Sequence, residues 1–269
     1  MSFIRLFCVL AIFLFLSCNN SNEISKPNIV LFMVDDLGWQ DTSVSFWKSE
    51  TKFNKLYNTP NMEILAEMGV RFTDAYATPV CSPSRISLMT GMNAAKHKVT
   101  NWTLHPNQKK PAEINHKSFD FPDWNYNGLS TRDSISNTIY ATPLPQILKD
   151  NGYYTIHAGK AHLGAIGYPS SNPLNIGFDI NIAGHAAGAP QSYLGMDNFG
   201  NNDSKNKIWA VPGLEKYHGK DIFLTQALSE EVLEKLHKPI NSKSPFFLYF
   251  SLYNVHAPLM EDNRFVEKY

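Results

Sequence analysis

The sequence lacks an excess of charge of either sign, because its 24 Lys and Arg residues equal its 24 Asp and Glu residues. Proteins that bind nucleic acids usually carry a clustered basic excess, so this balance gives no sign of a nucleic-acid partner. The combination of low hydrophobicity and high net charge that marks disordered chains is missing too. Of the 269 residues, 43% are hydrophobic and 13% are aromatic. These values indicate a globular chain that can bury a core, and no internal repeat is visible.

A membrane-spanning run is also missing. The apolar segment Leu6–Leu16 follows Arg5 and has eleven residues, whereas a helix that spans a bilayer needs about 20. The segment is typical of the apolar part of a signal peptide. Ser17-Cys18 after it resembles a bacterial lipobox, although Phe15 stands where Leu is usual.

We therefore expect residues 1–18 to be a lipoprotein-type signal peptide and residues 19–26 to be a polar tether. The protein would be exported to the periplasm, or held at the outer membrane or cell surface by a lipid anchor at Cys18. Simple cleavage and release is the alternative.

Cysteine is scarce, with three residues in the chain. Cys8 lies in the expected signal peptide and Cys18 would carry the lipid, which leaves Cys81 as the one cysteine of the folded body. An intramolecular disulfide is then impossible. A single thiol outside the cytoplasm is a liability unless it is used or modified, so the count favours a chemical use of Cys81.

Cys81 and Arg85 lie four residues apart, with Pro83 between them and an apolar helical pattern starting at Ile86. This spacing predicts a reactive side chain at the N-terminus of a helix, where unpaired backbone N–H groups and the helix dipole suit an anion. The guanidinium of Arg85 matches a tetrahedral oxyanion. The residues predict a nucleophile beside a sulfate or phosphate site; a buried, inert cysteine beside a surface arginine is the alternative.

Two carboxylates follow the first expected strand. The apolar run 29–34 fits a strand that is buried on both faces, and Asp35-Asp36 comes directly after it. At the carboxyl edge of a parallel sheet both side chains can turn toward one ligand. Oxygen ligands favour a hard cation, Ca²⁺ or Mg²⁺. A helix cap and turn without a metal is the alternative.

Two further strands end in reactive residues. Residues 153–159 precede Lys160 and His162, which would face the same way if the segment stays extended, as a pair for charge neutralisation and proton transfer. The run 246–253 precedes His256. A hydrogen-bonded structural histidine is the alternative for His256.

Helical patterns alternate with these strands, at about 60–69, 143–151 and 222–237, the last with Asp221 as its cap. Residues 96–140 are irregular, and residues 183–220 are rich in Gly, Asn and Ser and predict loops over the rim of the site. The alternation predicts an α/β fold with a mostly parallel central sheet flanked by helices.

Four motifs resemble those of the type I, formylglycine-dependent sulfatases, in particular exported bacterial arylsulfatase-like members. They are C-S-P-S-R with its flank (79–91), N-I-V followed by D-D-L-G (28–38), G-Y-x-T-x-x-A-G-K-x-H-L-G (152–164) and N-V-H-A-P (254–258). Ala161 departs from the bulky residue usual in the third motif. The resemblance implies an alkaline-phosphatase-like fold, with residues 27–269 as the N-terminal part of a catalytic domain.

The resemblance also implies the reaction, hydrolysis of sulfate monoesters on a sulfated small molecule or polysaccharide. A formylglycine-generating enzyme would oxidise Cys81 to formylglycine, the nucleophile, and a cation, Ca²⁺ rather than Mg²⁺, would bind Asp35, Asp36 and the modified Cys81. Arg85 and Lys160 would balance the charge of the sulfate. His256 would protonate the leaving alcohol, and His162 would deprotonate the sulfated hydrate.

The chain ends 13 residues after His256, where sulfatases normally continue with a further Asp, Asn and Lys at the site. We expect the chain to be the N-terminal fragment of a longer enzyme, with an incomplete site that binds the cation weakly or not at all and can be inactive on its own. Two alternatives remain: a related metal-dependent phosphoester or phosphonate hydrolase, and a non-catalytic lipoprotein that binds sulfated glycans.

Overall fold

The computed structural model describes residues 26–109, 117–118, 123–202, 205 and 207–268. The expected signal peptide and nearly all of the tether therefore lie outside the described residues. Within them, no helix combines the length and the apolar character that a membrane crossing requires.

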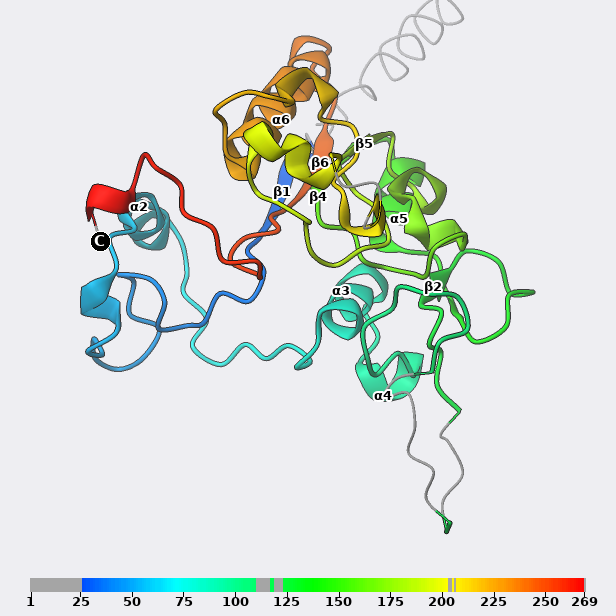
Figure 1. Cartoon of the computed structure of the whole chain (residues 1–269). Coiled ribbons are helices and arrows are strands. Elements are labelled where there is room, and N and C mark those ends of the chain that lie inside the picture. Colours follow the sequence, from blue (N-terminus) through cyan, green and yellow to red (C-terminus); the bar gives the residue numbers. More distant parts are fainter. Residues whose placement is uncertain (1–25, 110–116, 119–122, 203–204, 206, 269) are drawn as a thin grey trace, which may run out of the picture.

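A four-stranded parallel sheet forms the centre of the molecule (Figure 1). Its strands lie in the order β1-β6-β4-β5, with β1 at Ile29–Met33, β4 at Tyr154–Gly159, β5 at Ile180–Ile182 and β6 at Phe246–Ser251. A small second sheet pairs β2 (Leu129–Ser130) with β3 (Ile139–Tyr140). The expected α/β class and the three expected strands are confirmed, although β6 ends two residues earlier than the apolar run. The expectation that residues 29–34 are buried on both faces is wrong, because β1 is an edge strand whose Val30 and Phe32 are exposed.

Helices cover both faces of this sheet: α6 (Leu224–Asn241) packs on one face, and α3 (Cys81–Thr90) and α5 (Leu144–Asp150) pack on the other. Two further helices are α2 (Pro60–Met68) and α4 (Ala94–His97). Short 3₁₀ helices lie at Asn54–Leu56, Pro169–Ser171, Pro173–Ile176, Gly195–Gly200, Lys207–Trp209, Glu215–Tyr217 and Val266–Lys268.

The two faces of β6 carry two separate cores because successive side chains of a strand point to opposite sides. Leu248 and Phe250 pack on the side of α6, whose Leu224, Ala227, Leu228 and Val232 join the same cluster. Phe247 and Tyr249 pack on the other side, with residues of α3 and α5. All six residues of β6 are buried, so this strand is the centre of the fold.

The expected start of the long helix is wrong. The helix begins at Leu224 with Phe223 as its N-cap, and no side chain caps it, so Asp221 does not do so. Phe223 forms an antiparallel bridge with Leu194, and the N–H of Leu224 donates to the carbonyl of Tyr193 (2.8 Å). This pairing keeps the preceding residues extended.

The segment 183–220 also differs from the expected rim loops. Tyr193, Phe199, Val211 and Leu214 are buried in the α6 core. The segment is therefore part of the fold's packing, with an irregular backbone.

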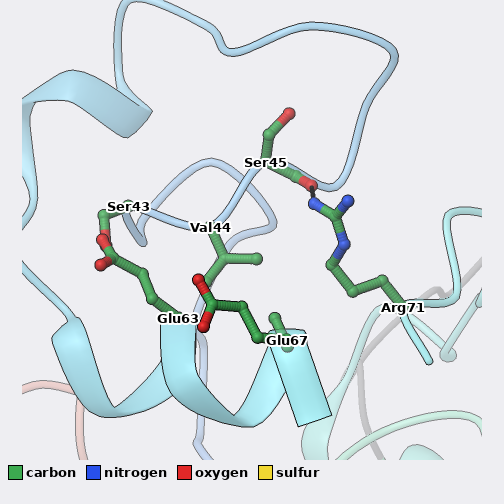
Figure 2. Close-up of a pocket in the computed structure, with 7 residues that line it drawn as sticks. Ser43, Val44, Ser45, Glu63, Glu67 and Arg71 are labelled. Atoms are coloured by element: carbon green, nitrogen blue, oxygen red, sulfur yellow. Dashed lines mark hydrogen bonds between the residues drawn. The ribbon is translucent and has the colours of Figure 1, made fainter. Parts of the chain in front are cut away.

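The region around α2 stands apart from the sheet (Figure 1). No residue of α2 is buried. An open cavity of about 330 Å³ lies between α2 and residues 43–45, lined by Glu63, Glu67 and Arg71 among others (Figure 2). Arg71 closes one side of it by donating to the carbonyl of Ser45 (2.5 Å).

The strands β1, β4 and β6 end in register, because Met33 and Gly159 both pair with Ser251. Gly159 has φ = 91°, and a Cβ on it would overlap the carbonyl oxygen of Ser251. That carbonyl accepts a hydrogen bond from the N–H of Lys160 (2.8 Å). Only glycine allows this approach, and the approach fixes where the chain leaves β4.

We predict that Gly159→Ala lowers the free energy of unfolding by about 3 kcal/mol or more, because it combines left-handed backbone strain with overlap. Gly167→Ala is the matched control. Gly167 also has a positive φ (81°), but no atom lies within 4 Å of the place that an added methyl group would take, so we expect a loss of about 1 to 2 kcal/mol. Denaturant unfolding measures both, and equal losses would contradict the steric explanation.

Candidate active site

The ends of three strands and the start of one helix meet at the carboxyl edge of the sheet. Asp35 and Asp36 follow β1, Lys160 follows β4 and His256 follows β6. A pocket of about 250 Å³ is lined by residues that include Asp35, Asp36, Cys81 and Arg85. The structure thus brings the predicted metal ligands, nucleophile and cation to one place, as expected for ligand sites in parallel sheets.

Cys81 is the first residue of α3, as predicted. Val80 precedes it with an extended backbone (φ = −129°), and no side chain caps the helix. The thiol is half-buried, has no disulfide partner and lines the pocket. It therefore lies beside the positive end of the α3 dipole, within reach of a ligand.

Arg85 lies one turn further along α3, and its guanidinium is buried. Nη2 donates to Oδ1 of Asp35 (2.8 Å), while Nη1 donates to the carbonyl of Lys160 (2.9 Å), to Tyr249 Oη (3.1 Å) and to Ser251 Oγ. The guanidinium thus hydrogen-bonds to protein groups, and Arg85 also lines the pocket beside Cys81. Its interaction with a bound oxyanion stays a prediction.

Lys160 completes a buried ionic triad. Its Nζ donates to Oδ2 of Asp35, so each oxygen of that carboxylate faces one cation. Burial is the main cause that lowers the pKa of Lys160, and the positive charge of Arg85 adds to it, while Cys81 and Asp35 oppose both. With Lys160 protonated, two cations and one anion leave the triad with a net charge of +1.

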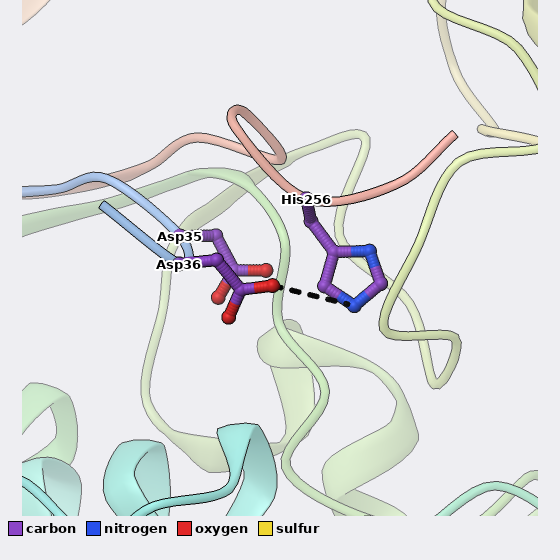
Figure 3. A group of neighbouring side chains, drawn as sticks. All are labelled: Asp35, Asp36 and His256. Carbon is purple, nitrogen blue, oxygen red and sulfur yellow. Dashed lines mark ion pairs between the residues drawn. The ribbon is translucent and has the colours of Figure 1, made fainter. Parts of the chain in front are cut away.

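Asp36 and His256 lie on the open side of Asp35 (Figure 3). His256 Nε2 is 3.9 Å from Oδ2 of Asp36, and one ligand atom from each of Asp35, Asp36 and His256 lies within 4.8 Å of the other two. Asp36 has a left-handed backbone (φ = 59°), which lets two consecutive carboxylates face one point. The two carboxylates thus converge, as the sequence predicted.

His256 fits a cation better than the sequence indicated. Its Nδ1 donates to the carbonyl of Ala257 (2.7 Å), so in the neutral ring Nε2 carries the lone pair. Two carboxylates and this nitrogen form a donor set that a divalent cation can use. The expectation named Asp35, Asp36 and Cys81 as ligands; among the described residues the cluster contains His256 in place of Cys81.

The segment that carries His162 is not extended. Strand β4 ends at Gly159, and His162 has φ = 51°, so the premise of an extended segment is wrong. The ring is buried, and its Nε2 hydrogen-bonds to the carbonyl of Thr103 (2.7 Å).

Sequence reasoning missed Tyr249 and Ser251, the β6 residues that hold Arg85. They lie two apart and so share one face of the strand. Two hydroxyl groups on one face of a fully buried strand are the signal that could have identified them.

Comparisons with known proteins agree with this arrangement. A family model described as sulfatase matches residues 27–269. The N-acetylgalactosamine-6-sulfatase of Mus musculus is 30% identical over 254 residues, which cover 89% of this chain and 42% of that protein. Arylsulfatase G of Mus musculus is 28% identical over 273 residues, covering 90% of this chain and 44% of that protein.

Solved structures give the same result for the fold. Ps i-CgsB, crystallised in complex with k-i-k-neocarrahexaose, matches with a TM-score of 0.59 at 28% identity, over 89% of this chain and 47% of that chain. A sulfatase from Pseudoalteromonas sp. shares the fold, with a TM-score of 0.53 at 22% identity, over 89% of this chain and 46% of that chain.

The chain thus spans less than half the length of the relatives it matches. The family match nevertheless covers most of the chain, from just before β1 to the last residue. The neighbours confirm the alkaline-phosphatase-like class that the motifs implied. The chain belongs to the sulfatase family.

Proposed function

We propose that this protein hydrolyses sulfate monoesters, with water as co-substrate and an alcohol and sulfate as products. One observation carries the proposal: with Lys160 protonated, the buried Arg85–Asp35–Lys160 triad has a net charge of +1, and it adjoins the pocket that holds Cys81 at the N-terminus of α3. Positive charge and a helix N-terminus both attract a sulfate group. The membership of the chain in the sulfatase family favours sulfate over other anions.

The substrate we propose is a sulfated carbohydrate. The related mouse protein is named for a 6-sulfated N-acetylgalactosamine, and the solved relative was crystallised with a neocarrahexaose. The exposed side of the pocket supports this class, since Asp36 is 62% exposed at its side chain and leaves room for a large substrate.

Cys81 is the residue we propose to be oxidised to formylglycine by a formylglycine-generating enzyme. Its accessible position and the lack of a disulfide partner fit such a modification. Formylglycine supplies a hydrated aldehyde whose oxygen can attack sulfur. The N-terminus of α3 orients this residue toward the anion, and Lys160 and Arg85 balance the negative charge that gathers on the sulfate.

Asp35, Asp36 and His256 would hold a divalent cation, which we propose to be Ca²⁺ rather than Mg²⁺ because Ca²⁺ accepts an irregular ligand geometry whereas Mg²⁺ requires a nearly octahedral one. When bound, the cation polarises the sulfate oxygens. Asp35 keeps its place because Arg85 and Lys160 hold both its oxygens.

His256 can instead carry a proton on Nε2, since its Nδ1–H is committed to Ala257. A proton there is suited to the leaving alcohol. His162 would accept the proton of the second hydroxyl of the sulfated hydrate, so that sulfate leaves and the aldehyde re-forms. Binding a cation and donating a proton are alternative uses of the same nitrogen of His256.

We also propose that the protein is exported and held at a membrane by a lipid on Cys18. The motif at Ser17-Cys18 supports this.

The modification is tested on the tryptic peptide Phe72–Arg85. We expect the peptide from protein produced with a formylglycine-generating enzyme to contain an aldehyde at Cys81 and no alkylatable thiol. Protein produced without that enzyme is the control, and should contain the free thiol. An intact thiol in both preparations would remove the catalytic proposal and leave binding of sulfated glycans as the function.

The same preparations test the reaction. The modified protein should release the alcohol from an aryl sulfate faster than from the matching aryl phosphate. Cys81→Ala should lower the rate by at least about 10³-fold, because the nucleophile is lost. Faster turnover of the aryl phosphate would identify a phosphoester hydrolase instead.

The cation site is tested by two aspartate variants. Asp36→Asn should lower the affinity for Ca²⁺ in calorimetry by at least about tenfold and change the free energy of unfolding by less than about 0.5 kcal/mol, because Asp36 is exposed. Asp35→Asn should instead destabilise the fold by about 3 kcal/mol or more, because it leaves two buried cations without a counter-ion. Unchanged Ca²⁺ affinity in Asp36→Asn would contradict the assignment.

A further inference from the structure

The ring of His162 is held in one tautomer by its surroundings. Nε2 lies 2.7 Å from the carbonyl oxygen of Thr103, which can only accept, so Nε2 must carry a hydrogen. In a neutral ring the other nitrogen, Nδ1, then has the lone pair. Nδ1 is buried and has no hydrogen-bond partner among the described residues.

The neutral form of this ring is favoured. Burial is the largest cause that lowers the pKa of His162 well below its usual value, and the positive charges of Lys160 and Arg85 lower it further. His162 therefore offers one proton-accepting nitrogen, and its identity follows from the bond to Thr103.

Thr103 is itself held by the residue that follows Cys81. The N–H of Thr103 donates to Oγ of Ser82 (3.1 Å), and the two hydroxyl oxygens lie 3.4 Å apart. Ser82 and Thr103 are both buried, so no bulk water competes for these bonds. A chain of contacts thus runs from the start of α3 through Thr103 to the ring of His162.

A glycine leaves the lone-pair side of the ring without a covering side chain. A Cβ on Gly188 would overlap both Nδ1 and Cε1 of His162. The backbone of His162 is fixed at the same time, because its N–H donates to the carbonyl of His185 (3.1 Å). The ring cannot rotate away from a side chain at position 188 without losing Thr103.

We propose that Ser82 and Gly188 are positioning residues for His162. Ser82, through Thr103, holds the Nε2–H tautomer, and Gly188 keeps Nδ1 free of a covering side chain, so that Nδ1 is the atom that accepts a proton. This inference rests on the hydrolysis proposed above. Nδ1 takes the proton of the remaining hydroxyl of the sulfated hydrate while the C–O bond to sulfate breaks and the aldehyde re-forms; the imidazolium keeps its Nε2–H bond to Thr103 and then passes the proton to water.

The tautomer is measured by long-range ¹H–¹⁵N correlation NMR of the protein labelled with ¹⁵N-histidine. His162→Gln removes the His162 signals from the spectrum and so assigns them. We expect the wild type to show one neutral ring with hydrogen on Nε2. A ring with hydrogen on Nδ1, or a doubly protonated ring at neutral pH, would overturn the inference.

Ser82→Ala deletes the hydroxyl that anchors Thr103, and we expect it to convert the single tautomer into a mixture. Ser82→Thr keeps a hydroxyl and should restore the single form. Ser84→Ala is the matched control, because Ser84 lies on the same helix and its hydroxyl donates to the carbonyl of Thr78 (2.6 Å); the His162 signals should not change. A single Nε2–H form in Ser82→Ala would remove Ser82 from the proposal.

Gly188→Ala tests the proposed role of Gly188, and its result does not depend on whether Ser82→Ala folds. We expect its methyl group to displace the ring and to shift both His162 nitrogen signals. Unchanged signals would exclude Gly188 from the positioning role.

Turnover of the formylglycine-containing protein then separates positioning from binding. Ser82→Ala and Gly188→Ala should lower kcat by about tenfold or more with KM little changed, since a misplaced base affects proton transfer. The predicted tautomer without any sulfatase activity would leave the positioning intact and remove the proposed function. Sulfatase activity together with hydrogen on Nδ1 of His162 would remove the positioning role and leave the proposed function intact.

Discussion

The carboxylate of Asp35, held between Arg85 and Lys160, is the interaction on which the site depends. It joins the ends of β1 and β4 to helix α3. The β6 side chains Tyr249 and Ser251 hold Arg85 in place by accepting hydrogen bonds from its guanidinium. Removing one partner of a buried ion pair leaves a charge without compensation, at a cost of about 3 to 5 kcal/mol. The site and the packing of these four elements are therefore maintained together.

The sheet explains why such a costly group of charges is tolerated. β6 is buried along its whole length and apolar except for the hydroxyl groups of Tyr249 and Ser251, and its two faces anchor the two cores. Charged residues appear only after the strands end in register, where the backbone leaves the sheet and side chains can converge. The strands thus supply the apolar burial that stabilises the fold, and the reactive side chains lie directly after the strand ends.

Much of this could be predicted from the sequence, because it depends on local pattern. Apolar runs followed by Asp35-Asp36, Lys160 and His256 indicate parallel strands whose reactive residues share one edge, and the residues around Cys81 indicate a helix start. What failed or was missed depends on contacts between distant segments. The bridge between Leu194 and Phe223 delays α6, the partners of Arg85 come from three other segments, and the backbone of His162 turns left-handed beside His185. No local pattern encodes these.

Strand β1 lies at the edge of the sheet, so it connects the site with the surface of the molecule. Val30 and Phe32 are each 55% exposed, and in the part of the chain that the structure describes no strand pairs with the outer side of β1. An open strand edge is a template for hydrogen bonding to another strand. Because β1 leads without interruption into Asp35 and Asp36, any polypeptide that adds to this edge stiffens the backbone that carries both carboxylates. The order of the outer edge of the sheet and the order of the Asp35 and Asp36 side chains are therefore coupled.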